Sequence, residues 1–197
     1  MKIRALLVGL LLLASTTSAI AAGPYIGAAG GVSIFHDSDI KDTGTTSNLE
    51  YDTGYGFNIS AGYNFDPIRV EFEFGYKQAN LDKITTNGVS ASETDDDATV
   101  MSYMANAYYD FKTNSPFTPY IGAGLGMINA EFKSPDFKED DTVFGYQVAV
   151  GAAYNINKNI ALDVSYRFQG AASDIKIEGS DVSYMSSNIM AGLRYNF

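Results

Sequence analysis

The sequence predicts an all-β protein that folds as an eight-stranded antiparallel up-and-down transmembrane β-barrel. Three observations lead to this fold class. Apolar and polar residues alternate with a period of two along eight segments, the connections between these segments are alternately short and long, and aromatic residues gather at both ends of the apolar face. Alternation indicates strands with two different faces, and antiparallel neighbours connected in this way can close into a barrel.

Residues 1–21 are expected to be a signal peptide and not part of the barrel. Two basic residues precede a short apolar run at 5–14 (ALLVGLLLLA), and small residues typical of a cleavage site follow it. We expect cleavage after Ala21 or Ala22, so that residues 22–197 form one barrel domain. The apolar run is shorter than the roughly 20 residues that a membrane-spanning helix needs.

The eight expected strands follow from the alternation. The clearest is Ile68 to Lys77 (IRVEFEFGYK), in which one face is apolar and the other is mostly charged. The segment before it alternates as well, and only Asp66-Pro67 separates the two, which indicates a tight turn. The strands are expected near residues 24–35, 54–65, 68–78, 98–111, 118–132, 142–156, 160–169 and 183–197.

The connections between these strands are of two kinds. Asp66-Pro67, residues 112–117 (KTNSPF) and residues 157–159 (NKN) are short, whereas the other four connections are long, polar and acidic. In an up-and-down barrel the short turns then lie at one end and the four long loops at the other.

The aromatic residues decide which face of the strands meets lipid. A soluble barrel would show the same alternation with its apolar face inside. Here two aromatic girdles flank an aliphatic band on the apolar face, as bilayer interfaces select, and small residues that fit a crowded lumen occupy the other face. The expected girdle residues are Tyr63, Phe65, Phe74, Tyr76, Tyr103, Tyr109, Phe111, Phe144, Tyr146, Tyr154, Tyr166, Phe168, Tyr195 and Phe197.

The composition excludes several classes of function. The formal net charge is −10 and becomes −12 when Lys2 and Arg4 leave with the signal peptide, so nucleic acid is not an expected partner. The chain contains no cysteine, which excludes disulfides and thiol chemistry. It contains no phosphate-binding loop, metal-ligand spacing or nucleotide fingerprint, and we predict no catalytic residue, cofactor or metal site.

The ending of the chain contributes to a family resemblance. The signal peptide, the eight strands, the stretch PYIGAGLG and the ending Leu193-Arg194-Tyr195-Asn196-Phe197 together resemble the small OmpA-like and opacity-protein (surface-antigen) family of outer-membrane barrels. The resemblance implies a place in the outer membrane of a Gram-negative cell and long loops outside the cell. It also implies that Phe197 is a signal for the barrel insertion machinery. No peptidoglycan-binding domain like that of OmpA follows Phe197, so anchoring through one is not expected.

The resemblance implies a function only in broad terms, because the family includes adhesins, structural anchors and surface antigens. The expected function is that of a surface-exposed structural or adhesin-like protein that acts through its four long acidic loops. Expected partners are outer-membrane lipids, lipopolysaccharide and a host or cell-surface ligand. The alternative is a narrow pore, and a more distant one is an enzyme that modifies lipid A.

Charged residues on the inward face form the first candidate site. The strands near 68–78 and 160–169 are expected to face each other across the lumen, so their carboxylates and guanidiniums can meet. One interpretation is a salt-bridged plug, because an unpaired charge in a confined space is costly. The other is an ion gate whose pairs exchange partners. The residues are Arg69, Glu71, Glu73, Lys77, Asp110, Asp163, Arg167 and Arg194.

The long loops give two further hypotheses. The runs Asp95-Asp96-Asp97 and Glu139-Asp140-Asp141 would either be solvated or collect divalent cations beside lipopolysaccharide head groups. The second hypothesis is a catalytic site for lipid A, because His36, the single histidine, precedes Asp37 and Ser38 at the expected outer rim. Sequence neighbours point in different directions, however, and a catalytic triad is defined by geometry.

The pentapeptide PYIGA occurs twice, at Pro24–Ala28 and Pro119–Ala123. Each copy is interpreted as the opening of a strand, since proline is tolerated as the first residue of a strand. Tyr25 and Tyr120 are expected to point into the lumen. Other matches at similar spacing suggest a four-strand unit that is present twice.

Overall fold

The computed structural model describes residues 22–36, 38–42, 45–51, 53–86, 89–92, 97–134, 137–173, 175–177 and 180–197. Thirteen strands occur in this part of the chain. No helix among these residues is long and apolar enough to span a membrane. The expected signal peptide, residues 1–21, lies outside the described residues.

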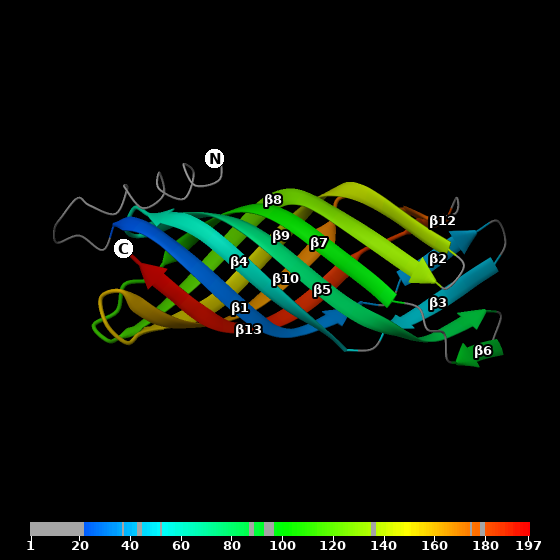
Figure 1. The fold of residues 1–197 in the computed structure, drawn as a ribbon, viewed down its shortest axis with the longest axis horizontal. Helices are drawn as coiled ribbons and strands as arrows, with labels where there is room; N and C mark the ends of the chain where they lie inside the picture. Colours follow the sequence, from blue (N-terminus) through cyan, green and yellow to red (C-terminus); the bar gives the residue numbers. More distant parts are fainter. Residues whose placement is uncertain are drawn as a thin grey trace, which may run out of the picture.

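Eight of the strands close into one antiparallel barrel, which confirms the predicted fold (Figure 1). They pair in chain order, and the last pairs back with the first, so that the ring is closed. The barrel strands are β1 (Gly23–Phe35), β4 (Gly54–Asn64), β5 (Ile68–Thr86), β7 (Asp97–Asp110), β8 (Phe117–Ser134), β9 (Phe137–Asn155), β10 (Ile160–Ala171) and β13 (Met185–Asn196).

The alternation along each strand separates an outer face from a filled lumen. In the two PYIGA copies, Tyr25 is 1% and Tyr120 2% exposed, whereas the next residues, Ile26 and Ile121, are 43% and 51% exposed. Successive side chains of a strand point to opposite sides. The tyrosines therefore lie in the lumen and the isoleucines on the outer face.

The outer face carries aromatic residues at both ends of the barrel. The rings of Phe74 and Tyr103 are 5.3 Å apart near the long loops, and those of Tyr195 and Phe197 are 5.1 Å apart near the short turns. The expected girdle residues lie on this face, exposed or half-buried. Four outward aromatic residues of the described chain that are not among the expected girdle residues are Tyr55, Phe57, Phe72 and Phe117.

Several strands continue beyond the barrel, further than the alternation predicted. β5 runs to Thr86 instead of about residue 78, and β9 begins at Phe137 instead of about residue 142. Strands also occur in connections that were expected to be loops, because pairing satisfies the backbone groups of polar residues as well as those of apolar ones. These strands are β2 (Ser38–Asp42), β3 (Thr45–Tyr51), β6 (Val89–Ser92), β11 (Ile175–Ile177) and β12 (Ser180–Val182).

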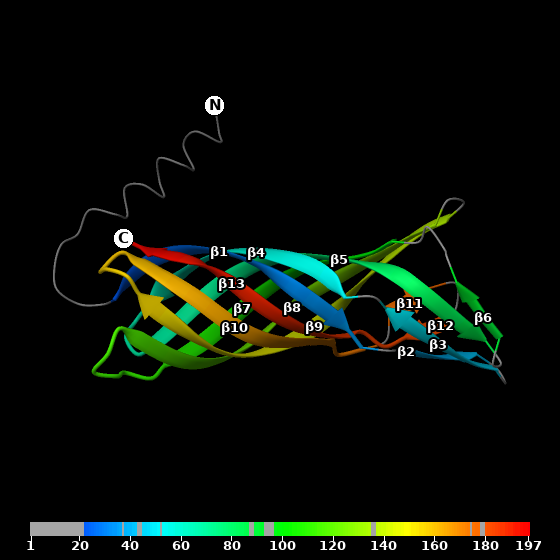
Figure 2. The same cartoon turned by 90° about the horizontal axis from the view of Figure 1, so that it is seen from below.

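A small sheet, here called the loop platform, is formed by β2, β3, residues 81–86 of β5, and β6. β2 pairs with β3, β3 pairs with β5, and β6 pairs with the same part of β5. Figures 1 and 2 show the platform at the long-loop end, opposite the C-terminus. β11 and β12 form a separate two-stranded sheet at this end.

Candidate functional site: the filled lumen

The structure places all eight predicted lumen charges inside the barrel. Seven of them are buried, and Asp163 is half-buried. Four are cationic and four are anionic, so their formal charges cancel. From the short turns towards the long loops, they occupy successive layers.

Arg69 lies in the layer nearest the short turns. Its Nε donates hydrogen bonds to both carboxylate oxygens of Asp110, at 2.7 and 3.0 Å. The guanidinium carbon lies 4.6 Å from the ring centre of Tyr108 and 4.9 Å from that of Tyr120. The carboxylate therefore neutralises the arginine, and aromatic faces add cation–π contacts.

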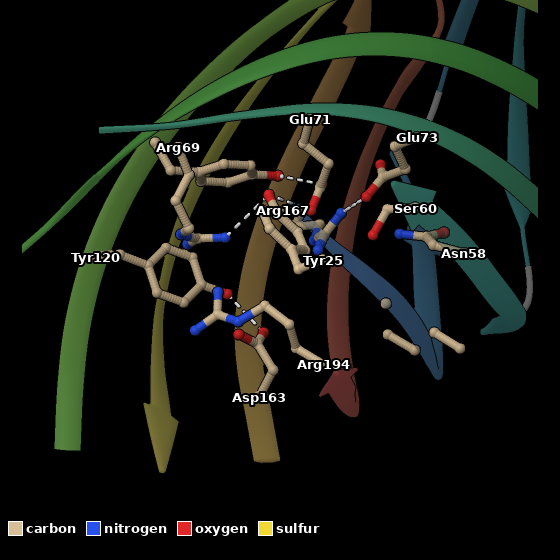
Figure 3. Close-up of a pocket in the computed structure, with 14 residues that line it drawn as sticks. Tyr25, Asn58, Ser60, Arg69, Glu71, Glu73, Tyr120, Asp163, Arg167 and Arg194 are labelled. Atoms are coloured by element: carbon tan, nitrogen blue, oxygen red, sulfur yellow. Dashed lines mark hydrogen bonds and ion pairs between the residues drawn. The ribbon is translucent and has the colours of Figure 1, made fainter. Parts of the chain in front are cut away.

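Tyrosine hydroxyls hold the other two carboxylates of this layer (Figure 3). Glu71 accepts hydrogen bonds from Tyr25 at 3.0 Å and from Tyr108 at 3.2 Å. Asp163 accepts one from Tyr120 at 2.6 Å, and Figure 3 shows the Arg194 side chain beside it. Hydrogen bonds to an ionised carboxylate are stronger than those between neutral groups, so these tyrosines stabilise buried charge.

These side chains line a pocket of about 30 Å³. Arg69 Nη2 and Arg194 Nε and Nη1 are buried and have no hydrogen-bond partner among the described residues. A pocket for a small organic ligand usually encloses about 300 Å³ or more. The volume is therefore far too small for an organic cofactor or substrate.

Glu73 and Arg167 connect opposite sides of the barrel in the next layer. Glu73 lies on β5, Arg167 lies on β10, and Arg167 Nη1 donates a hydrogen bond to Glu73 Oε2. Gln147 Nε2 donates to the other carboxylate oxygen at 3.2 Å. The structure thus brings together side chains from the two strands that the sequence analysis placed across the lumen.

Lys77 lies closer to the long loops, and its contacts differ from the expected ion pairing. Its Nζ donates hydrogen bonds to Gln169 Oε1 at 2.6 Å, and to the hydroxyls of Tyr184 and Ser186 at 3.3 Å each. Within the described lumen, none of its hydrogen-bond partners is a carboxylate. The packing around Lys77, Gln147 and Gln169 leaves no space for a water molecule.

An apolar cluster fills the long-loop end of the lumen. Its buried members are Phe35, Ala79, Val100, Ile128, Ala130, Val143, Ile175 and Tyr184. Tyr184 joins the two kinds of packing, because its ring lies 6.0 Å from that of Phe35 and its hydroxyl contacts Lys77. Sequence reasoning missed this cluster, since Ile175 lies in a connection that was expected to be polar.

His36 contacts a serine other than its sequence neighbour. Its Nε2 lies 2.9 Å from Ser187 Oγ, which in turn lies 2.8 Å from the Tyr166 hydroxyl. No carboxylate hydrogen-bonds to His36 within the described residues, and Asp37 lies outside them. The contact thus supplies two members of a triad and not the third.

The acidic runs are only partly described. Asp95 and Asp96 lie outside the described residues, and Asp140 and Asp141 lie on β9. In the part of the chain that the structure describes, no three His, Cys, Asp or Glu residues are grouped so that they could hold a metal ion. Cation binding by these runs stays a prediction.

A closed antiparallel barrel with an apolar, aromatic exterior and a polar, filled interior is the construction of a small outer-membrane β-barrel protein. The comparison with known sequences agrees. Over residues 4–197 the chain matches the family described as outer membrane protein beta-barrel domain, and it belongs to this family. The protein is therefore located in the outer membrane of a Gram-negative bacterium.

Relatives and solved structures resemble the chain over most of its length. It is 28% identical to the putative adhesin RC1281 of Rickettsia conorii, with 85% of this chain and 79% of the relative covered. It is 24% identical to outer membrane protein PagN of Salmonella typhimurium, with 73% of each covered. The fold resembles that of Neisserial surface protein A, with a TM-score of 0.65 at 24% identity, over 89% of this chain and 97% of that protein.

Proposed function

We propose that this protein is a surface-exposed, adhesin-like outer-membrane protein whose long-loop end contacts other surfaces. One observation carries the proposal: charged layers and an apolar cluster fill the lumen, while β5, β8 and β9 continue past the barrel and help to build its long-loop end. Binding surfaces are commonly built on loops that a rigid scaffold holds in place.

The filled lumen argues against the alternative of a narrow pore. An ion would have to pass the layer around Lys77, which has no space for water. It would then meet the apolar cluster around Ile128, which offers little to replace its hydration shell. We expect no stepwise conductance when the purified protein is added to planar bilayers.

The relatives support the adhesive role over an enzymatic one. One is named a putative adhesin, and the chain covers most of its length. We propose that His36 has no catalytic role. The His36→Ala variant is then expected to leave lipid A composition in cells unchanged, and altered acylation would contradict this.

We propose lipopolysaccharide and a host or cell-surface ligand as partners of the long-loop end. Carboxylates such as those of Asp140 and Asp141 can share divalent cations with lipid phosphates, because calcium and magnesium prefer oxygen ligands. Calorimetry with calcium tests this step, and no heat of binding would remove it. We also propose that Phe197, exposed on the outer face, is recognised by the insertion machinery.

A whole-cell binding comparison tests the proposed function. A non-adherent Gram-negative strain would display the wild-type chain, a variant with short turns in place of residues 37–52 and 81–96, and a control altered only at 113–116. Binding to matrix proteins, to lipopolysaccharide and to other purified outer-membrane barrel proteins is measured with equal amounts of each variant on the cell surface. We expect binding by the wild type and the control and its loss in the loop variant. Equal binding by all three, or none by the wild type, would contradict the proposal.

A further inference from the structure

One member of the apolar cluster comes from outside the barrel wall. Ile175 lies on β11, a three-residue strand of the fourth long connection, and it is 1% exposed. The other members lie on barrel strands or, in the case of Tyr184, directly before β13. A long connection therefore inserts an apolar side chain into the mouth of the barrel.

The hairpin that carries Ile175 is fixed at both of its roots. Before β11, Ala171 N donates a hydrogen bond to Tyr184 O, and Ala172 N donates one to Phe144 O on β9, at 2.9 and 2.8 Å. After β12, Met185 O accepts one from His36 N at 2.9 Å. Burial of Ile175, the first residue of β11, adds a third attachment at the base of the hairpin, so the base is fixed to the mouth of the barrel as well as at both roots.

The same hairpin reaches the loop platform. β11 pairs only with β12 among the described strands, through Ile175 opposite Val182 and Ile177 opposite Ser180. β12 lies beside β2, which is the end strand of the platform. Figure 2 shows β11 and β12 together with β2 and β3 at the long-loop end. A continuous series of strands therefore leads from the mouth of the barrel to the platform.

We propose that Ile175 is a positioning residue for the contact surface: it fastens the β11–β12 hairpin into the lumen, and the hairpin in turn holds the loop platform at a fixed orientation through β12 and β2. The inference rests on the proposed function, because the platform is taken to be part of the surface that binds. Ile175 itself touches no ligand. Its effect on binding is indirect, through the order of the platform.

The proposal predicts how the platform responds when the fastening is removed. A serine at position 175 would place a hydroxyl among Phe35, Val100, Ile128 and Val143, where burial without a hydrogen bond is unfavourable. The hairpin would then leave the mouth, and β2 would lose the neighbour beside it. Valine at the same position keeps an apolar side chain of nearly the same shape and should keep the hairpin in place.

Limited proteolysis in lipid nanodiscs tests the proposal without measuring adhesion. The variants are Ile175→Ser, Ile175→Val and the matched control Ile156→Ser, which alters an exposed isoleucine at the short-turn end. Lys41 is paired with Thr46 in β2 and β3, so we expect a lysine-specific protease to cut there at a rate that follows the population of the open platform. We expect cleavage at Lys41 to become about tenfold or more faster in Ile175→Ser and to stay at the wild-type rate in the other two variants.

Two results would overturn the proposal. One is a wild-type rate at Lys41 in Ile175→Ser although Lys176 on β11 is cut faster, which would mean that the hairpin moves without affecting the platform. The other is no change at either lysine. If Ile175→Ser does not fold, as judged by circular dichroism and by heat-dependent gel mobility, Ile175→Ala replaces it with the same expected outcomes.

Adhesion measured in parallel separates this inference from the proposed function. Faster cleavage at Lys41 together with weaker cell binding supports both. If Lys41 is cut faster in Ile175→Ser but the wild type binds no ligand, the positioning role of Ile175 is kept and the adhesive function is rejected. Undiminished binding in Ile175→Ser with an opened platform would reject the link between them.

Discussion

Breaking the ion pair between Glu73 and Arg167 should strongly destabilise the barrel. The Glu73 side chain is 2% exposed and that of Arg167 is 10% exposed. In Arg167→Met the Glu73 carboxylate keeps one protein donor, the amide of Gln147. Removal of one partner from a buried ion pair costs about 3–5 kcal/mol, because the remaining charge is left without compensation. We expect a loss of stability in this range.

The second substitution makes the effect specific to the pair. In Glu73→Gln the guanidinium of Arg167 keeps its hydrogen bond to Ser165 Oγ at 3.2 Å but loses its counter-ion, so this variant should also be much less stable. The double variant contains neither charge. Because replacement of a buried ion pair by neutral groups is often close to neutral in free energy, the double variant should be more stable than either single one.

The free energy of unfolding would be measured by urea titration in phospholipid vesicles. The chain has no tryptophan, so circular dichroism and gel mobility report the folded fraction. The control is Lys112→Met, which removes the exposed end of the 2.9 Å pair with Asp66 and should cost less than about 1 kcal/mol. Additive losses in the double variant, or a loss in Arg167→Met no larger than that of the control, would refute the reasoning.

Two further pairs of substitutions test the packing of the barrel wall and its lipid-facing surface. A Cβ at Gly122 would collide with the Tyr108 ring, whereas a Cβ at Gly30 would have its nearest atom 3.7 Å away. Gly122→Ala should therefore cost about 1–3 kcal/mol of stability, and Gly30→Ala much less. Equal losses in urea titrations would contradict this. On the outer face of β8, Leu125→Arg should cost about 2–4 kcal/mol in a bilayer and Asn129→Arg, nearer the interface, about 0–1 kcal/mol; equal costs would mean that the membrane boundary is misplaced.

The alternation, together with the connection lengths and the aromatic girdles, was sufficient to predict the barrel and the direction of its side chains. Tyr25 and Ile26 show why: adjacent residues of a strand must face opposite sides, so a run of alternating residues fixes every orientation at once. The direction of Glu73 and Arg167 into the lumen was predictable for the same reason. Their contact was expected only from the approximate position of two strands.

The partners inside the lumen could not be predicted in the same way. Lys77 was expected in a network of ion pairs, but it contacts the neutral oxygens of Gln169, Tyr184 and Ser186. Which side chains meet depends on the stagger of the strands around the barrel, which the period of a sequence does not specify. Ile175 was missed because a strand of three residues has too few positions to show any period.

The two PYIGA copies have the same structural role in the two halves of the barrel. Tyr25 donates to Glu71, and Tyr120 donates to Asp163. Each carboxylate is the fourth residue of its strand, β5 or β10. Each tyrosine lies two strands before it, on β1 or β8, with β4 or β9 in between. The residues opposite the tyrosines are Gly62 and Gly151, where a Cβ would lie 2.5 Å from a tyrosine ring atom. The agreement extends the suggested four-strand repeat from sequence to contacts.

The two tyrosines should nevertheless differ in how much they stabilise the barrel. Loss of a hydrogen bond to a charged group costs about 1.5–3 kcal/mol. In Tyr120→Phe, Asp163 loses its tyrosine donor, whereas in Tyr25→Phe, Glu71 keeps the hydroxyl of Tyr108. Tyr120→Phe should therefore be the more destabilising of the two in urea titrations. The opposite order, or no loss in either variant, would show that these hydroxyls do not hold the buried carboxylates.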